Sequence, residues 1–134
     1  MSRKLEFLVR APQQNWQEIL DALTARDVKI LAFGTYSDAT GNNLLLVTEN
    51  ETRTMAALNS IGLRWQSDSV VFLENAQRHG TSVTALGARL AQAGIGLIYS
   101  YASWIEEEGL FAVFKTADDE RAMRFLEKLS APPG

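Results

Sequence analysis

Apolar and polar side chains alternate from residue 5 to residue 9, with the apolar ones on one face. Such alternation predicts a half-buried strand. Pro12 ends this strand, because proline has no backbone N–H to donate to a sheet. The next segment predicts a helix that Asn15 can cap, since its apolar residues recur at helical spacing. This apolar stripe consists of Trp16, Ile19, Leu20 and Leu23.

Two strands and a second helix follow. Residues 29–36 and 43–48 predict a hairpin, because the Ser-Asp-Ala-Thr-Gly-Asn segment at 37–42 is rich in turn formers. Residues 51–61 predict a shorter helix, and Gly62 is a natural stop after it. These elements form one βαββα unit.

The same order of elements then recurs. Residues 63–74 predict a long extended stretch, broken near Ser67 and Asp68, that closes the first unit and opens the second. A helix, two strands and a last helix follow, at residues 83–90, 95–102, 110–115 and 122–129. The sequence therefore predicts two units, at residues 1–68 and 69–134.

A constant offset between matching positions indicates an internal repeat. Adding 67 to eight apolar positions of the first unit reaches apolar positions of the second, whereas Phe7 matches Phe72 at an offset of 65. The alternative is that any two α/β segments share such spacing. The eight positions are Trp16, Ile19, Leu23, Val28, Ile30, Leu44, Val47 and Leu58.

Composition narrows the classes of function. The chain of 134 residues is 46% hydrophobic, which suffices for a core. Its 13 Lys and Arg against 16 Asp and Glu give a net charge of -3, so we expect neither nucleic acid nor anionic membrane as a partner. The absence of cysteine excludes disulfides and thiolate metal sites. Without a signal peptide or an apolar membrane span, a cytoplasmic location is expected.

The second unit resembles the ACT domain, a module that binds amino acids to regulate metabolism. The ACT pattern is a strand, a loop usually holding Pro-Gly, a helix with apolar residues three and then four apart, and a further strand. Here the loop is 75–80, the helix stripe lies in 83–90, and the strand is the Ile-Gly-Leu-Ile-Tyr-Ser-Tyr segment at 95–101. Over residues 4–129 the chain looks most like stand-alone bacterial proteins made of two ACT units.

The resemblance implies an α+β fold of two tandem ferredoxin-like βαββα(β) units with antiparallel sheets. It implies a regulatory, non-catalytic protein that binds an amino acid or a related small carboxylate, needs no cofactor, and acts on a separate enzyme or regulator. After the last helix only Ala-Pro-Pro-Gly remains, at 131–134, so the second unit is expected to lack its last strand. That loss exposes the neighbouring strand unless another segment covers it.

The resemblance places the ligand at the loop before the helix of the second unit and on the strand beside it. A glycine next to a helix start lets backbone N–H groups approach a carboxylate, which the helix dipole also favours. The first unit has no glycine in its loop at 11–15. Instead of contacting a ligand, the loop residues can form an ordinary turn followed by a capped helix, and Tyr99 can serve in core or interface packing. The expected contacts are Asn75, Gln77, His79, Gly80, Thr81, Ser82, Tyr99 and Ser100.

Catalytic and metal-binding interpretations are weak. His79 is the only histidine, and no nucleophile elbow accompanies it. The three glutamates at 106–108 are typical of a solvated hairpin turn rather than a metal site. Residues 109–114 faintly resemble an RNA-binding strand. The three glutamates directly before them would repel the phosphates of RNA, which argues against that function.

Several predicted strands carry apolar residues on both faces, as at Val71 and Phe72, whereas the helices can cover one face only. This pattern predicts a homodimer in which a second copy covers the other face. The alternative to a ligand-binding regulator is a structural or protein-interaction module of ACT type that has lost its ligand.

Overall fold

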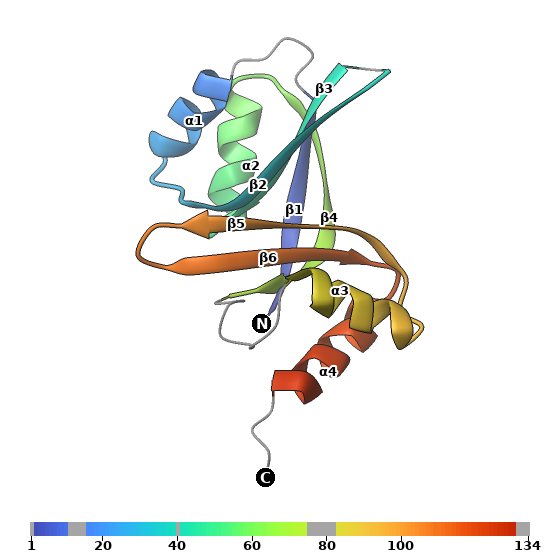
Figure 1. Ribbon diagram of the computed structural model, residues 1–134. Helices are drawn as coiled ribbons and strands as arrows, with labels where there is room; N and C mark the ends of the chain where they lie inside the picture. The colour runs from blue at the N-terminus through green and yellow to red at the C-terminus, as the bar shows by residue number, and fades with distance from the viewer. Residues whose placement is uncertain (1, 11–15, 40, 75–82, 131–134) are drawn as a thin grey trace. The chain divides into compact units, whose positions relative to one another are not determined.

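The computed structural model describes residues 2–10, 16–39, 41–74 and 83–130 (Figure 1). Its strands are hydrogen-bonded in the order β2-β3-β1-β4-β6-β5. The α+β class and the succession of elements agree with the prediction from the sequence. No helix in these ranges is long and apolar enough to cross a membrane. The elements are β1 Ser2–Arg10, α1 Trp16–Thr24, β2 Ile30–Asp38, β3 Gly41–Thr48, α2 Glu51–Ser60, β4 Arg64–Leu73, α3 Val83–Gln92, β5 Leu97–Ile105, β6 Gly109–Thr116 and α4 Asp119–Ser130.

Contacts within the chain define two compact units. Leu5–Asp68 form the N-terminal unit, and Ser69–Gly134 together with Met1–Lys4 form the C-terminal unit. The predicted break near Ser67 and Asp68 is wrong, because β4 continues as one strand from Arg64 to Leu73. Both units therefore share the residues of a single strand.

The first residues of the chain take part in the C-terminal unit. The guanidinium of Arg3 donates to Ser69 Oγ at 3.4 Å, and the Lys4 ammonium lies 5.5 Å from the centre of the Phe72 ring. Since β1 is the hydrogen-bonded neighbour of β4, the start of β1 occupies the place of the expected missing last strand. The strand edge that was expected to be exposed by the missing last strand is thus covered by residues 2–4.

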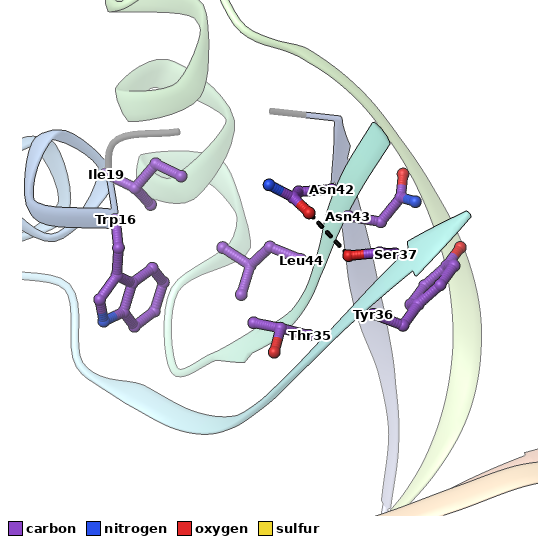
Figure 2. Close-up of a pocket in the computed structure, with 8 residues that line it drawn as sticks. All are labelled: Trp16, Ile19, Thr35, Tyr36, Ser37, Asn42, Asn43 and Leu44. Carbon is purple, nitrogen blue, oxygen red and sulfur yellow. Dashed lines mark hydrogen bonds between the residues drawn. The ribbon is translucent and has the colours of Figure 1, made fainter. Parts of the chain in front are cut away.

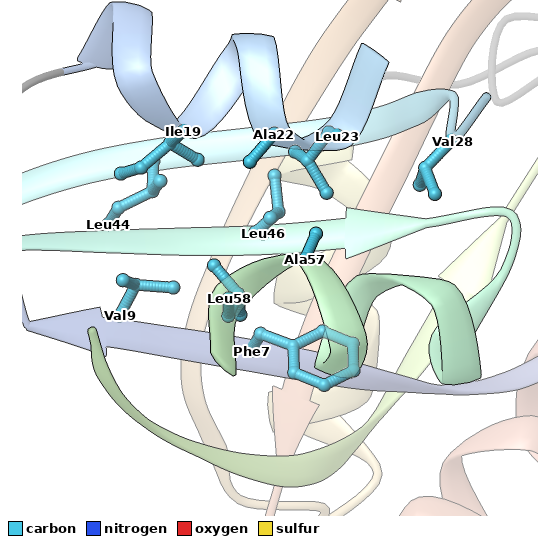
Figure 3. Packing of buried hydrophobic residues seen from close by; sticks show 10 residues of the cluster. All are labelled: Phe7, Val9, Ile19, Ala22, Leu23, Val28, Leu44, Leu46, Ala57 and Leu58. Carbon is cyan, nitrogen blue, oxygen red and sulfur yellow. The ribbon is translucent and has the colours of Figure 1, made fainter. Parts of the chain in front are cut away.

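Each unit has its own apolar core under two helices. In the N-terminal unit, α1 and α2 pack on one face of β1 and β3, and the buried stripe of α1 interdigitates with the strand side chains (Figure 3). In the C-terminal unit, α3 and α4 contact each other and the β5–β6 hairpin. The second core contains Val71, Leu73, Leu86, Leu90, Ile95, Ala112, Phe114, Ala122 and Leu126.

Strand registers correct the offsets of the internal repeat. Ile30 pairs with Thr48 and Leu97 pairs with Thr116, and a register shift follows directly after both pairs. The offset is therefore 67 in β2 but 68 in β3, because the turn at 106–108 is one residue longer than its counterpart at 39–40. From β3 onward, the predicted matches at an offset of 67 are wrong by one residue.

The opening strands also match differently from the prediction. Phe7 pairs with Leu46, and Val71 pairs with Phe114, so Val71 and not Phe72 is the counterpart of Phe7. Phe72 lies on the other face of β4, where its ring stacks on Phe111 with centres 5.4 Å apart. A slip of one residue exchanges the two faces of a strand, which is why the predicted offset of 65 cannot hold.

The same set of polar hydrogen bonds joins the two helices in each unit, and the spacing of apolar residues does not reveal it. Asn50 Oδ1 accepts from the backbone N–H of Arg53 at 2.9 Å, and the Arg53 side chain donates to the carbonyl of Arg26. In the same way Asp118 Oδ1 accepts from Arg121 N at 3.1 Å, and Arg121 donates to Ala93 O at 2.7 Å. One side chain caps the start of a helix while the arginine satisfies carbonyls at the end of the preceding one.

Replacing Asn50 by alanine is expected to lower the free energy of unfolding by about 1 kcal/mol, because one backbone donor of α2 loses its cap. Urea unfolding of the variant measures this loss. Asn50→Asp is the matched control, since a carboxylate keeps the acceptor and interacts well with the helix dipole. Equal midpoints for Asn50→Ala and the parent chain would contradict this role.

The face of the strands opposite the helices is also buried. Val47, Val70, Phe72 and Val113 are all 0% exposed in the single chain. Burial on both faces of these strands agrees with the apolar pattern of the sequence. The homodimer stays a prediction.

Candidate functional site

A pocket of about 390 Å³ lies in the N-terminal unit, between the start of α1 and the far end of the β2–β3 hairpin (Figure 2). We call it the Trp16 pocket. This volume lies within the range of small-ligand sites in proteins. Its lining consists of Trp16, Ile19, Thr35, Tyr36, Ser37, Asn42, Asn43 and Leu44.

The register of the hairpin decides which side chains face the pocket. Thr35 pairs with Leu44, and Ser37 pairs with Asn42. Because side chains alternate along a strand, these two pairs share the face toward α1. Tyr36 and Asn43 form the pair between them and project to the other side of the hairpin (Figure 2).

One wall of the Trp16 pocket is apolar. Ile19 and Leu44 belong to the core and fix the floor, whereas Trp16 is 36% exposed. The indole is held by Phe33 of β2, with ring centres 5.2 Å apart at an angle of 34°. A preformed aromatic surface of this kind can bind an apolar or aromatic group with little loss of side-chain entropy.

The opposite wall carries neutral polar groups. The Ser37 hydroxyl donates to Asn42 Oδ1 at 2.7 Å, which directs the amide N–H groups of Asn42 away from Ser37. The Thr35 hydroxyl lies on the same face one pair further along. None of the eight described lining residues is charged. The wall therefore offers amide donors and hydroxyl acceptors instead of an ion pair.

The start of α1 adds a weak preference for negative charge. Trp16 is the first described residue of this helix, so the positive end of the helix dipole lies beside the pocket. This partial charge favours a carboxylate. Together with the Asn42 amide, it can orient a small carboxylate whose apolar part lies on Trp16.

The sequence assigned Ser37 and Asn42 to a turn, which is wrong. Both residues belong to strands, and only positions 39 and 40 separate β2 from β3. Their cross-strand pairing and side-chain hydrogen bond extend the hairpin beyond the expected end. Serine and asparagine are turn formers by local preference, and here tertiary pairing overrides that preference.

At the two pairs that face the Trp16 pocket, the counterpart residues of the C-terminal unit are apolar. By register, the Trp104–Leu110 pair occupies the place of Ser37 and Asn42. The Ala102–Ala112 pair likewise stands where Thr35 and Leu44 stand. At these two pairs, hydroxyl and amide groups therefore occur in the hairpin of the N-terminal unit only.

Six of the residues expected from the sequence to bind ligand lie outside the described residues: Asn75, Gln77, His79, Gly80, Thr81 and Ser82. Tyr99 and Ser100 both lie on β5, but their side chains point to opposite faces of the strand. Tyr99 stacks with Tyr101, with ring centres 6.3 Å apart, whereas Ser100 is exposed. Participation of these eight residues in a ligand site stays a prediction.

The turn at 106–108 is as predicted. Glu106, Glu107 and Glu108 connect β5 to β6 and are exposed. The backbone N–H of Glu108 donates to Ile105 O at 3.0 Å, which closes the turn. Within the described residues, no group of three or more His, Cys, Asp or Glu side chains is placed to hold a metal ion.

The structure has an ACT-type ferredoxin-like α+β fold, and its similarity to known proteins lies in this fold. No family model and no curated protein matches the sequence. Among solved structures, protein BT0572 from Bacteroides thetaiotaomicron has a TM-score of 0.73 and 13% identity, over 95% of this chain and 87% of that one. The ligand-free regulatory subunit of aspartate kinase from Thermus thermophilus has a TM-score of 0.62 and 15% identity, over 95% and 91%. The same subunit from Thermus flavus has a TM-score of 0.60 and 12% identity, over 98% and 94%.

Proposed function

We propose that this chain is a regulatory protein of two tandem ACT-type units that binds an amino acid or a related small carboxylate and catalyses no reaction. The observation that carries the proposal is the Trp16 pocket, which combines an aromatic wall with the Ser37–Asn42 pair. The fold shared with regulatory subunits of aspartate kinase supports a regulatory role. Its target is then a separate enzyme or regulator.

The pocket chemistry favours one kind of amino acid. The carboxylate of the ligand would accept from the Asn42 amide near the positive end of the α1 dipole, while the ammonium of the ligand would donate to the hydroxyl oxygens of Thr35 and Ser37. The side chain would then lie on Trp16. Since no described lining residue is charged, we expect an uncharged, apolar or aromatic side chain rather than a charged one.

Thermal unfolding in the presence of each of the twenty amino acids tests the proposal. A ligand at ~100 times its dissociation constant should add about 2.7 kcal/mol to the free energy of unfolding. Apolar and aromatic amino acids should raise the midpoint, and Asp, Glu, Lys and Arg should not. A chain that responds to none of the twenty, nor to related keto or hydroxy acids, would contradict this function.

Two single variants locate the bound ligand. Ser37→Ala removes a pocket hydroxyl and should weaken binding by about tenfold, the effect of one hydrogen bond. Ser100→Ala removes an exposed hydroxyl from β5, which the sequence placed in the second-unit site, and serves as the matched control. The opposite ranking would move the site to the C-terminal unit.

A structural or protein-interaction module is the second candidate. The apolar Trp104–Leu110 pair favours it for the C-terminal unit, because the hydrogen-bonding groups of the Trp16 pocket have no counterpart there. A stable protein partner together with no ligand response would support this candidate for the whole chain.

A further inference from the structure

A second cavity of the N-terminal unit lies where β1 and β4 run side by side. It has a volume of about 230 Å³, and its lining comes from these two strands, which are neighbours in the sheet. All the described lining residues belong to the N-terminal unit. We call this hollow the Arg64 cavity. Its lining consists of Leu8, Arg10, Arg64, Trp65 and Gln66.

The alternation of side chains places both arginines on the face opposite the helices. Phe7 of β1 and Trp65 of β4 pack in the apolar core. Arg10 follows Phe7 by three positions, an odd number, so its side chain points to the other face of the sheet. Arg64 and Gln66 flank Trp65 and point to that face for the same reason.

Trp65 holds the backbone of β4 in place beside the cavity. Its ring packs edge-on against Phe7, with ring centres 5.5 Å apart, and its indole N–H donates to Asn59 Oδ1 at 2.9 Å. Both contacts are made on the side of the helices. The positions of Arg64 and Gln66 are therefore set before any ligand binds, which lowers the entropic cost of binding.

The lining carries two positive charges and no negative one. Arg10 and Arg64 each contribute a guanidinium, which stays ionised at ordinary pH, and Gln66 adds a neutral amide. Glu6 and Asp68 lie further along the same two strands and are not part of the lining. Two like charges beside one cavity repel each other, so an anion bound between them is favourable.

The C-terminal unit does not repeat this charge arrangement. Because Phe7 and Val71 are counterparts by register, the position that corresponds to Arg10 is Glu74. Glu74 is exposed directly after the end of β4. The same scaffold thus folds with the opposite charge at this place, and the fold itself does not require an arginine there.

A phosphoryl group matches the cavity in charge and in size. It carries up to two negative charges and three acceptor oxygens around one phosphorus atom. Two guanidinium groups can each donate a pair of hydrogen bonds to such oxygens. The volume of about 230 Å³ lies below the range of about 300–1,000 Å³ for drug-sized ligands, so the ligand must be small.

We propose that the Arg64 cavity is a second binding site, which takes the phosphoryl group of inorganic phosphate or of a small phosphate monoester. Arg10 and Arg64 hold the phosphoryl oxygens, and the Gln66 amide donates to one of them. The site shares no described lining residue with the Trp16 pocket. It therefore stands whether or not an amino acid binds in that pocket.

Titration of the intact chain with inorganic phosphate at constant ionic strength tests the site through the NMR resonances of the arginine Nε–H groups. The resonances of Arg10 and Arg64 should shift together and saturate, whereas that of Arg89, exposed on α3, should not. Glycerol 3-phosphate is the second probe. Tighter binding than that of phosphate assigns the site to a monoester, and weaker binding assigns it to inorganic phosphate. Succinate bound more tightly than both would overturn the phosphoryl assignment.

Charge variants locate the bound phosphate. Arg64→Gln removes one guanidinium and should weaken phosphate binding at least about tenfold, the effect of one charged hydrogen-bonding group. Arg10→Glu introduces the charge that Glu74 carries in the C-terminal unit and should abolish binding. Arg89→Gln is the matched control, since it removes the same charge from α3. Equal affinities for Arg64→Gln and Arg89→Gln, or shifts in the parent chain that never saturate, would overturn the proposal.

Discussion

A chain that begins at Leu5 is expected to lose about 3 kcal/mol of stability in its C-terminal unit, although every residue from Ser69 to Ser130 is still present. The deleted residues 2–4 belong to that unit. Their removal shortens the strand that is hydrogen-bonded to β4, at about 1 kcal/mol for each bond lost, and takes away the Lys4 contact with the Phe72 ring, which contributes about 0.5–1 kcal/mol.

Native-state hydrogen exchange distinguishes this effect from a general loss of stability. In the truncated chain, the amides of Val71 and Val113 should exchange faster, whereas those of Leu44 and Leu46 in the N-terminal unit should keep most of their protection. Arg3→Ala is the control for the side chain alone, since its bond to Ser69 is long and exposed. Equal loss of protection in both units would refute the assignment of residues 2–4.

The sequence predicted the elements well because their signals are local. The stripe of α1 and the stop at Gly62 follow from spacing and backbone preference within a few residues, and Gly62 indeed has a positive φ of 70°. The duplication was predicted from eight apolar positions. The hydrogen bonds of Arg53 and Arg121 to carbonyls at the end of the preceding helix also match between the two units. They could not be predicted, because they join residues 27 and 28 positions apart and leave no periodic pattern in the sequence.

Register and strand sharing could not be predicted because they depend on distant partners. The turn at 106–108 has one residue more than the turn of the first hairpin, and this residue shifts every later match between the units by one. The composition of the chain does not reveal where such an additional residue lies. Residues 2–4 are all polar and show no apolar alternation, so nothing local indicates that they complete a unit beginning at Ser69. These features follow from pairing across the sheet.

The Trp16 pocket was missed for a related reason. Trp16 fitted the apolar stripe of a helix, and Ser37 and Asn42 fitted a turn. Each assignment was locally sound. The three side chains form one site only because β2 and β3 remain paired up to their ends, which brings a polar pair under the first turn of α1. Gly80, which favoured the second-unit loop as the ligand site, is likewise a local signal that does not reveal which residues come together in the fold.

Replacing Ser37 by tryptophan and Asn42 by leucine should abolish ligand stabilisation while the fold persists. The double variant gives the N-terminal unit the pair that the C-terminal unit already carries, Trp104 and Leu110, on an equivalent hairpin. An indole would fill much of the cavity of about 390 Å³ and remove two hydrogen-bonding groups. Affinity should fall by about 100-fold or more, equivalent to about 2.7 kcal/mol.

Calorimetric titration with the amino acid that most raises the unfolding midpoint measures this loss. Ser37 and Asn42 are exposed, so urea unfolding of the ligand-free variant should change by less than about 0.5 kcal/mol. Trp104→Ser is the control, since it alters the corresponding hairpin of the other unit and should leave affinity unchanged. Full binding by the double variant, with loss of binding in Ser100→Ala, would place the ligand at β5.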